Sequence, residues 1–237
     1  MRALTILLFI PTLFFCRRLP EEPIPMQPEL GSEKIDILAL GDSYTKGESV
    51  KWAQNFPNQL ADSLRASGFN LAGLRVVAET GWRTDNLQIA LSNQASVLAD
   101  STFSLVTLCI GVNNQFQNAN FETYKRQFEE LLQYAIARAG GRKERVVVLS
   151  IPDWAYTPFG QSWGNPSNTS SQIDQYNAAN QAITEQYDVI YVNVTAVSRR
   201  GILEPDLVAF DGLHPSGLQY TEWVKLLLPE VKMRLKP

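Results

Sequence analysis

Short runs of apolar, mostly β-branched residues alternate with longer amphipathic segments from residue 35 to the end of the chain. The short runs predict strands, at residues 35–40, 74–78, 105–110, 145–150 and 189–194. The segments after them have helical periodicity, at residues 56–66, 85–98, 121–139, 173–187 and 217–235. Strands that alternate with helices in this way indicate an α/β domain built on a parallel, doubly wound sheet.

Residues near the ends of these segments refine the predicted boundaries. Thr84 has the position and chemistry of an N-cap for the second helix. Pro229 predicts a kink or a break in the last helix, because a proline inside a helix removes a hydrogen bond. The polar stretch at residues 152–170 predicts a long loop.

Composition narrows the class of protein. With 45% hydrophobic and 19% charged residues among 237, the chain is neither disordered nor a collagen-like or coiled-coil repeat. The net charge of −3 argues against a nucleic-acid-binding protein. Two cysteines and one histidine are too few for a disulfide framework or a structural zinc site.

The first residues of the chain have the pattern of an export signal. Met1-Arg2 precede an apolar run, residues 3–15, that is shorter than the ~20 apolar residues of a membrane-spanning helix. The end of this run, Leu13-Phe14-Phe15-Cys16, resembles a bacterial lipoprotein cleavage box, although phenylalanines stand where small residues are usual. We therefore expect residues 1–16 to be a lipoprotein-type signal peptide and Cys16 to carry lipid. A plain signal peptide and an uncleaved anchor are the alternatives.

A proline-rich segment follows the signal. Four prolines fall within residues 20–28, which opposes both helix and sheet. We expect residues 17–34 to be an extended tether and residues 35–237 to be the folded domain. The expected location is the bacterial cell envelope, with the protein bound to the membrane through a lipid on Cys16. A secreted or periplasmic protein is the alternative.

A serine follows the first predicted strand, in the segment Gly41-Asp42-Ser43. In a doubly wound fold the loops at the carboxyl ends of the strands form the ligand crevice. Ser43 is therefore in the right place for a nucleophile. Taken alone, it is equally well placed to be a helix N-cap.

The only histidine of the chain supports the catalytic interpretation. His214 lies three residues after Asp211, on a segment that contains Gly212 and Pro215 and is predicted to be a loop. This spacing allows Asp211 to accept a hydrogen bond from Nδ1 of His214. The other ring nitrogen, Nε2, is then free to take a proton from a serine.

Two further segments follow the second and third predicted strands. Gly81 offers a backbone N–H that a substrate can approach closely, and Asn113 offers a side-chain amide suited to an oxyanion. All these segments follow strands or precede the last helix. One crevice is therefore expected to contain Ser43, Gly81, Asn113 and the pair Asp211 and His214.

These motifs resemble those of the SGNH hydrolases, also called the GDSL esterase/lipase superfamily. The resemblance extends from residue 35 to about residue 223 and implies a flavodoxin-like three-layer α/β/α sandwich with a five-stranded parallel sheet. It implies that Ser43 is the nucleophile, His214 the base and Asp211 its partner. It also implies an oxyanion hole made by the N–H groups of Ser43 and Gly81 and the side chain of Asn113.

The sequence departs from the family pattern at two positions. Tyr44 replaces the commoner leucine after the serine, and Asn114 stands where the family usually has aspartate. An asparagine keeps a hydrogen-bonding side chain without the charge, so we expect Asn114 to order its loop. Neither position carries the chemistry.

The substrate pocket is predicted less sharply. Asn114 and several aromatic residues belong to loops expected near the crevice, the aromatic ones being Trp82, Trp154, Tyr156, Phe159 and Trp163. Such rings stack on a sugar or line an acyl pocket, and the alternative is that they pack the long loop against the domain.

The function expected from these observations is that of an exported serine esterase. It hydrolyses small, lipid or acetylated-sugar esters through an acyl-enzyme and needs neither a metal ion nor an organic cofactor. An O-acyltransferase with the same triad is the alternative. A non-catalytic surface binding module is a further one.

Overall fold

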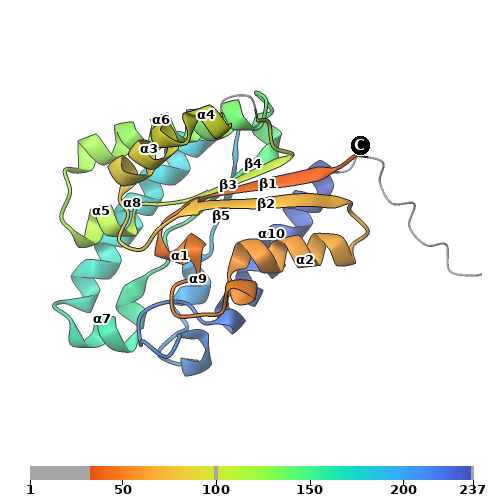
Figure 1. Ribbon diagram of the computed structural model, residues 1–237. Helices are drawn as coiled ribbons and strands as arrows, with labels where there is room; N and C mark the ends of the chain where they lie inside the picture. The colour runs from red at the N-terminus through yellow and green to blue at the C-terminus, as the bar shows by residue number, and fades with distance from the viewer. Residues whose placement is uncertain (1–32, 99–100, 236–237) are drawn as a thin grey trace, which may run out of the picture.

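Residues 33–98 and 101–235 are described by the computed structural model of the protein (Figure 1). The signal segment with Cys16, and the tether up to residue 32, lie outside the described residues. Within those described ranges, no helix is at once long enough and apolar enough to cross a membrane.

Five parallel strands form one sheet. They are β1 Ile35–Gly41, β2 Leu71–Ala78, β3 Leu105–Cys109, β4 Val146–Leu149 and β5 Ile190–Val192. Their order in the sheet is β2-β1-β3-β4-β5. This confirms the predicted parallel, doubly wound sheet. The order reverses between β1 and β3, and doubly wound proteins bind their ligands at such a reversal.

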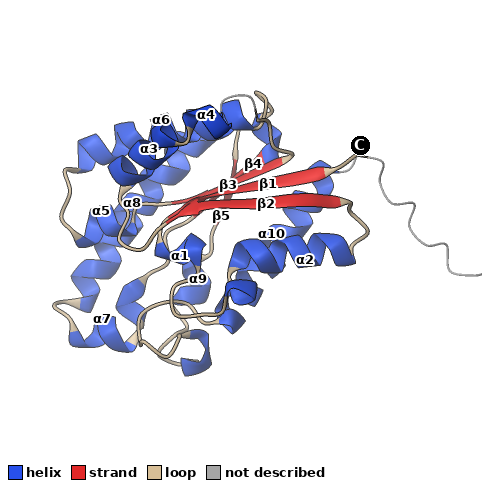
Figure 2. Cartoon of the chain, in the orientation of Figure 1, coloured by secondary structure: helices blue, strands red, loops and turns tan. Residues whose placement is uncertain are grey.

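Helices cover both faces of this sheet, so the fold is a three-layer α/β/α sandwich (Figures 1 and 2). The long helices are α2 Phe56–Ala66, α3 Thr84–Asn93, α6 Phe121–Arg138, α8 Pro166–Gln186 and α10 Gly217–Leu235. In one layer α2 packs against α10. In the other, α6 contacts both α3 and α8.

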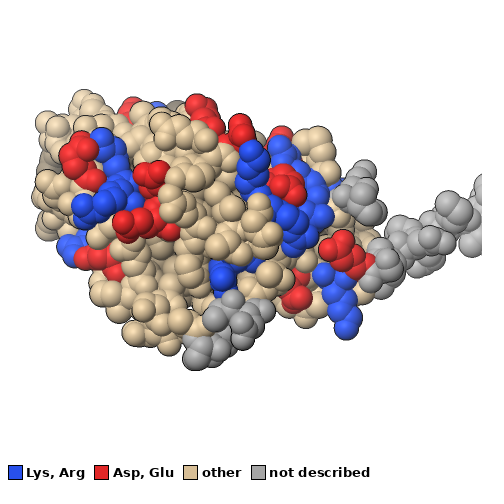
Figure 3. Space-filling view, turned by 90° about the horizontal axis from the view of Figure 1, so that it is seen from above, with Lys and Arg blue, Asp and Glu red and all other residues tan. Residues whose placement is uncertain are grey.

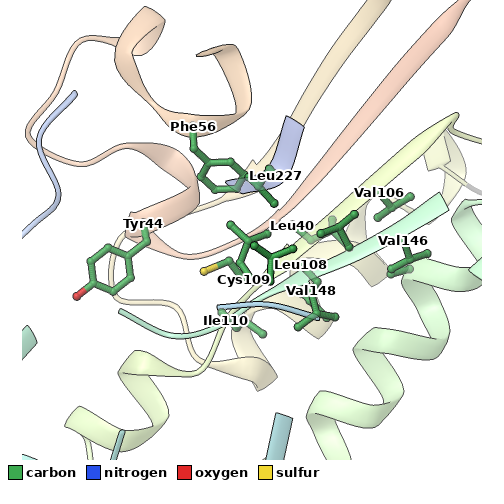
Figure 4. Packing of buried hydrophobic residues seen from close by; sticks show 14 of the residues in the cluster. Leu40, Tyr44, Phe56, Val106, Leu108, Cys109, Ile110, Val146, Val148 and Leu227 are labelled. Atoms are coloured by element: carbon green, nitrogen blue, oxygen red, sulfur yellow. The ribbon is translucent and has the colours of Figure 1, made fainter. Parts of the chain in front are cut away.

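The hydrophobic core is centred on β1 and β3, whose side chains are covered on both faces. Leu40 of β1 pairs in register with Leu108 of β3, and both are fully buried. Phe56 of α2 and Leu227 of α10 also belong to this core (Figure 4). Burial on both faces explains why β3 reads as a continuous apolar run in the sequence.

Charges of both signs are mixed on the surface. On the face in Figure 3, Lys and Arg side chains lie beside Asp and Glu side chains. On α6, for example, Lys125 Nζ is 2.8 Å from Glu122 Oε2. Paired charges of this kind largely cancel beyond a Debye length, so this face differs from the positive surfaces that bind nucleic acids.

The helix predicted at residues 85–98 differs from the observed structure. It is divided into α3 and a short helix, α4 Ala95–Leu98, and Thr84 is the first helical residue of α3, not its N-cap. The backbone N–H of Thr84 donates instead to Oδ1 of Asn114, at 3.0 Å. A side chain from a distant loop thus caps this helix, which explains why the local sequence misplaced its start.

The loop predicted at residues 152–170 is mostly helical in the structure. It contains η3 Trp154–Tyr156, α7 Pro158–Ser162 and the first turns of α8. Thr157 and Asn165 cap α7 and α8, and a proline occupies the first turn of each helix. The helices η3 and α7 are too short to show a helical period, and the first turn of α8 is polar, so a periodicity analysis does not detect them.

The last helix runs without interruption over its predicted range, with Pro229 inside it. A break at Pro229 is therefore excluded, and a kink there stays a prediction. Short helices also begin directly after two strands: α1 Ser43–Lys46 after β1 and α5 Val112–Phe116 after β3. These two turns lie at the strand ends where the candidate site residues are found.

Candidate active site

Ser43 is the first residue of α1, immediately beyond the carboxyl end of β1. The residue before it, Asp42, caps this helix by accepting a hydrogen bond from the N–H of Tyr44 at 3.0 Å. Burial raises the pKa of Asp42 to about 7, although backbone hydrogen bonds from Tyr44 and Gly111 act in the opposite direction. The turn is therefore fixed by a buried carboxyl group, and it presents Ser43 with only 4% of its surface exposed.

Asp211 and His214 form a close pair on the loop before α10. Nδ1 of His214 lies 2.6 Å from Oδ2 of Asp211. The second carboxylate oxygen, Oδ1, accepts the backbone N–H groups of Leu213 and His214, at 2.9 and 3.0 Å. The carboxylate therefore holds both the ring and the backbone of this loop. Such an arrangement fixes the tautomer of the imidazole with its proton on Nδ1.

A second side chain binds the same carboxylate. The hydroxyl of Ser49 donates to Oδ2 of Asp211 at 2.6 Å. Burial acts to raise the pKa of Asp211, but the hydrogen bonds from Ser49, His214 and the backbone outweigh it and lower this pKa to about 2. Ser49 was not identified by the sequence analysis, because no motif surrounds it and it lies far from Asp211 along the chain.

These groups surround one pocket of about 160 Å³. The residues that line it come from the ends of three strands, from η3 and from the loop before α10; they are Ser43, Tyr44, Thr80, Gly81, Val112, Asn113, Phe116, Trp154, Leu213 and His214. The structure thus brings together Ser43, His214, Gly81 and Asn113, with Asp211 behind His214.

Ser43 and His214 both line this pocket. Within the described residues, the hydroxyl of Ser43 makes no hydrogen bond to the ring of His214. The ring of Tyr44 packs edge-on against that of His214, with 5.7 Å between centroids. Catalytic hydrogen bonds often form only when substrate is bound, so this geometry is compatible with proton transfer.

The two other predicted oxyanion donors lie at the same pocket. Gly81 has φ +81, a conformation that favours glycine, and a Cβ at this position meets nothing within 4 Å. Nδ2 of Asn113 donates one of its hydrogens to the carbonyl oxygen of Trp82 at 3.0 Å. This bond holds the amide in place and leaves its second N–H for a ligand.

A group of charged residues joins the Gly81 loop to α1. Lys46 Nζ, at the end of α1, lies 2.5 Å from Glu79 Oε1 and 3.5 Å from Glu48 Oε2. Glu48 also accepts a hydrogen bond from the hydroxyl of Thr80, which lowers its pKa. This group connects the segment that carries Ser43 with the segment that carries Gly81, and the sequence analysis did not identify it.

Of the six residues predicted near the substrate pocket, only Trp154 lines it. Asn114 is only 2% exposed and bonds to Thr84, from Nδ2 to Oγ1 at 2.8 Å and from the Thr84 N–H to Oδ1 at 3.0 Å. Trp82 packs against the core, and Tyr156 lies 5.9 Å from the Arg199 guanidinium. Trp154 alone lies at the pocket.

Phe116 is a pocket residue that the sequence analysis did not select. It is the last residue of α5, a helix too short to produce a periodic pattern. An aromatic residue shortly after Asn113 is the one signal in the sequence that points to it. The structure places this ring beside Trp154, with 5.4 Å between centroids.

The sequence of the chain matches a known protein family. Residues 39–221 match the GDSL-like Lipase/Acylhydrolase family. A search of curated proteins finds no match. The match covers the end of β1, the other four strands, α1, the Gly81 loop and the loop with Asp211 and His214.

Solved structures with the same fold include three esterases or lipases. A family 3 carbohydrate esterase from Clostridium thermocellum has a TM-score of 0.66 and 18% identity, over 86% of this chain and 98% of that one. A lipase/acylhydrolase from Enterococcus faecalis has a TM-score of 0.64 and 21% identity, over 86% and 98%. An acetylxylan esterase from Geobacillus stearothermophilus has a TM-score of 0.60 and 18% identity, over 83% and 94%. At these identities the likeness concerns the fold.

Proposed function

Because the chain belongs to the GDSL-like lipase/acylhydrolase family and is an ester hydrolase of that type, we propose that it is an exported serine esterase with Ser43, His214 and Asp211 as its catalytic triad. The observation that carries this proposal is the Asp211–His214 pair, 2.6 Å apart, at the pocket that Ser43 lines. A histidine–carboxylate pair at a pocket that a serine also lines is the arrangement that activates a hydroxyl group.

In the first half of the reaction, Nε2 of His214 takes the proton of the Ser43 hydroxyl while Oγ attacks the ester carbonyl. Asp211 stabilises the imidazolium through Nδ1. The negative oxygen of the tetrahedral intermediate is bound by the N–H groups of Ser43 and Gly81 and by the amide of Asn113. His214 then gives its proton to the leaving alcohol, and the acyl group remains on Ser43.

In the second half, water takes the place of the alcohol. His214 removes a proton from this water, which attacks the acyl-enzyme, and the same donors bind the second oxyanion. Collapse of the intermediate returns the proton to Ser43 and releases the carboxylic acid. A pocket of about 160 Å³ suits a small acyl group. We propose small, lipid or acetylated-sugar esters as the substrate class.

A fluorophosphonate probe tests the triad directly. The wild-type protein is expected to be labelled on the peptide that contains Ser43, as read by mass spectrometry. The Ser43→Ala and His214→Ala variants are expected to lose the label, while Ser92→Ala, at an exposed position on α3, keeps it. Failure of the wild-type protein to be labelled, or labelling at another serine, would refute this assignment.

The location of the enzyme is a separate part of the proposal. The signal-like residues 1–16 support export, and Cys16 at their end supports attachment to a bacterial membrane through lipid. A single acyl chain anchors a protein only marginally, so the proposal implies more than one chain on Cys16.

A further inference from the structure

Four aromatic rings are packed together beside the catalytic pocket, and we call the three outer ones, Phe116, Phe159 and Trp163, the aromatic platform. Trp154 lies beneath them as the inner ring. The rings of Phe159 and Trp163 are nearly parallel, 13° apart, with 5.5 Å between centroids. Phe116 lies 5.4 Å from Trp154 and 6.4 Å from Trp163. The rings therefore form a continuous surface from the pocket outward.

Exposure increases along this surface. Trp154 is 4% exposed, Phe116 41% and Trp163 56%. The two exposed rings belong to different segments, α5 and the residue that follows α7. Large aromatic side chains gathered at a pocket entrance, with their faces open to solvent, are typical of a surface that binds a ligand.

The platform is fixed to the catalytic loop and to the domain. The N–H of Phe159 donates to the carbonyl of Gly212 at 2.9 Å, next to Asp211. Nε1 of Trp154 donates to Gln115 at 2.9 Å, and Gln115 donates to Gln172 of α8 at 2.7 Å. These bonds hold the ring of Trp154 and the backbone of Phe159 in place relative to the pocket, which lowers the cost of ordering this surface when a ligand binds.

The surroundings of the platform are polar but uncharged. No Asp, Glu, Lys or Arg occurs in residues 154–173 or 111–121, in a chain with 19% charged residues. The exposed or half-buried polar side chains of these segments are amides and hydroxyls and include Gln117, Gln161, Ser162, Asn165 and Gln172. The platform thus combines apolar ring faces with neutral hydrogen-bonding groups.

Two arginine side chains near these segments, Arg83 and Arg199, form ion pairs with carboxylates. Arg83, which donates to Gln117, also forms an ion pair with Asp85 at 2.6 Å. Arg199, beside Tyr156, pairs with Asp153 at 3.0 Å and Asp174 at 2.6 Å. A phosphate or uronate group on a ligand therefore finds no free positive partner among these residues, which favours a neutral ligand.

From this arrangement we infer that the platform binds the sugar rings of a neutral O-acetylated oligosaccharide, the acetyl group of which enters the catalytic pocket. The inference rests on the proposed esterase function and names the substrate class of the same site. Pyranose rings have apolar C–H faces that stack on aromatic rings, and their hydroxyls pair with amides. Hydrolysis of the bound ester by water yields acetate and a free sugar hydroxyl.

The size of the pocket supports a binding mode in which the acetyl group lies inside the pocket and the sugar lies outside it. Typical small-molecule sites enclose about 300–1,000 Å³. The pocket beside Ser43 encloses about 160 Å³. A short acyl group fits this space, whereas the alcohol part of the substrate has to lie outside it. The platform is the surface on which that part rests.

The experiment compares Trp163→Ala with Trp52→Ala, a matched control. Trp52, in η1 Trp52–Gln54, is 57% exposed and is not a pocket residue. For each purified protein, kcat/KM is measured on O-acetylated xylohexaose and cellohexaose and on vinyl acetate, which has no sugar. We expect Trp163→Ala to lower the ratio of oligosaccharide to vinyl acetate activity about tenfold, through KM. Trp52→Ala is expected to keep the wild-type ratio.

A binding measurement separates this inference from the esterase proposal. Deacetylated xylohexaose and cellohexaose are titrated calorimetrically into the wild-type protein and both variants, and weaker binding by Trp163→Ala alone is expected. An unchanged activity ratio for Trp163→Ala, or higher kcat/KM on 4-nitrophenyl palmitate than on the acetylated sugars, overturns the glycan inference. Platform-dependent binding without hydrolysis of any ester supports the glycan inference and refutes the esterase proposal.

Discussion

The hydroxyl of Ser49 lies 2.6 Å from Oδ2 of Asp211, the same oxygen that lies 2.6 Å from Nδ1 of His214. Ser49 and Asp211 are 162 positions apart along the chain. Ser49 belongs to the turn after α1, where its φ of 65° is unusual for a residue with a side chain. The turn that follows Ser43 thus reaches the carboxylate that orients His214.

Ser49→Ala is expected to lower kcat a few-fold with little change in KM. The hydroxyl helps to position the carboxylate that stabilises the imidazolium, and because this hydrogen bond is already formed in the free protein, only a part of its free energy contributes to kcat. Steady-state kinetics on any hydrolysed ester, with thermal melting beside them, provide the measurement.

Ser49→Gly serves as the control for the backbone of this turn. Glycine tolerates the positive φ and lacks the hydroxyl. We therefore expect Ser49→Gly to melt at a higher temperature than Ser49→Ala and to show the same loss of kcat. Wild-type kcat in Ser49→Gly would mean that Ser49 shapes the turn only.

Asn113 and its neighbour Asn114 are expected to respond differently to substitution by alanine. Asn113→Ala removes an oxyanion donor from the pocket, and such a loss typically costs about 10²–10³-fold in kcat with little change in KM. Asn113→Asp is expected to do no better, because a carboxylate would face a negative oxygen.

Asn114→Ala, in contrast, removes the cap of α3 and leaves the buried N–H of Thr84 without its partner. An unsatisfied buried group costs about 1–3 kcal/mol, so the melting temperature should fall while kcat per folded molecule is retained. Steady-state kinetics and thermal melting of Asn113→Ala and Asn114→Ala distinguish the loss of an oxyanion donor from a loss of stability. Retention of kcat by Asn113→Ala would show that its amide does not bind the oxyanion.

Asp42 is expected to make the stability of the protein depend on pH. Burial raises its pKa in the folded state from 3.8 to about 7. A raised folded-state pKa means that the folded protein binds the proton more tightly. The stabilisation is therefore complete below pH 3.8 and is lost as the pH rises to about 7.

Asp42→Asn tests this dependence because it has no proton to lose. The difference in melting temperature between the wild-type protein and Asp42→Asn is measured from pH 4 to pH 8. The wild-type protein should lose stability relative to the variant as the pH increases. A constant difference across this range would contradict the raised pKa.

Cys16→Ser is expected to change the location of the protein in a bacterial host. The wild-type protein should fractionate with membranes and carry lipid at the amino terminus of its mature form. The variant should appear in the soluble fraction or keep its signal segment. Mass spectrometry of the mature amino terminus is the measurement, and an unmodified Cys16 would refute lipidation without affecting the esterase proposal.

The local sequence pattern is sufficient to predict the sheet, the long helices and the order of the motifs. The ranges of α2 and α10 agree with the helical periodicity at residues 56–66 and 217–235. Such patterns are reliable because burial of one helical face, or of both faces of a strand, dictates which positions are apolar. The Asp211-x-x-His214 spacing similarly encodes a contact that forms within one turn of the chain.

Contacts between residues that are distant in the sequence became visible only in the folded domain. Ser49 reaches Asp211, Asn114 caps α3, and Phe116 joins Trp163 on one surface. Each of these contacts joins segments that are distant in the sequence, and nothing in the residues nearby along the chain specifies the partner. The packing of the sheet and its two helical layers brings the loops to one end of the domain, where hydrogen bonding and ring packing select the contacts.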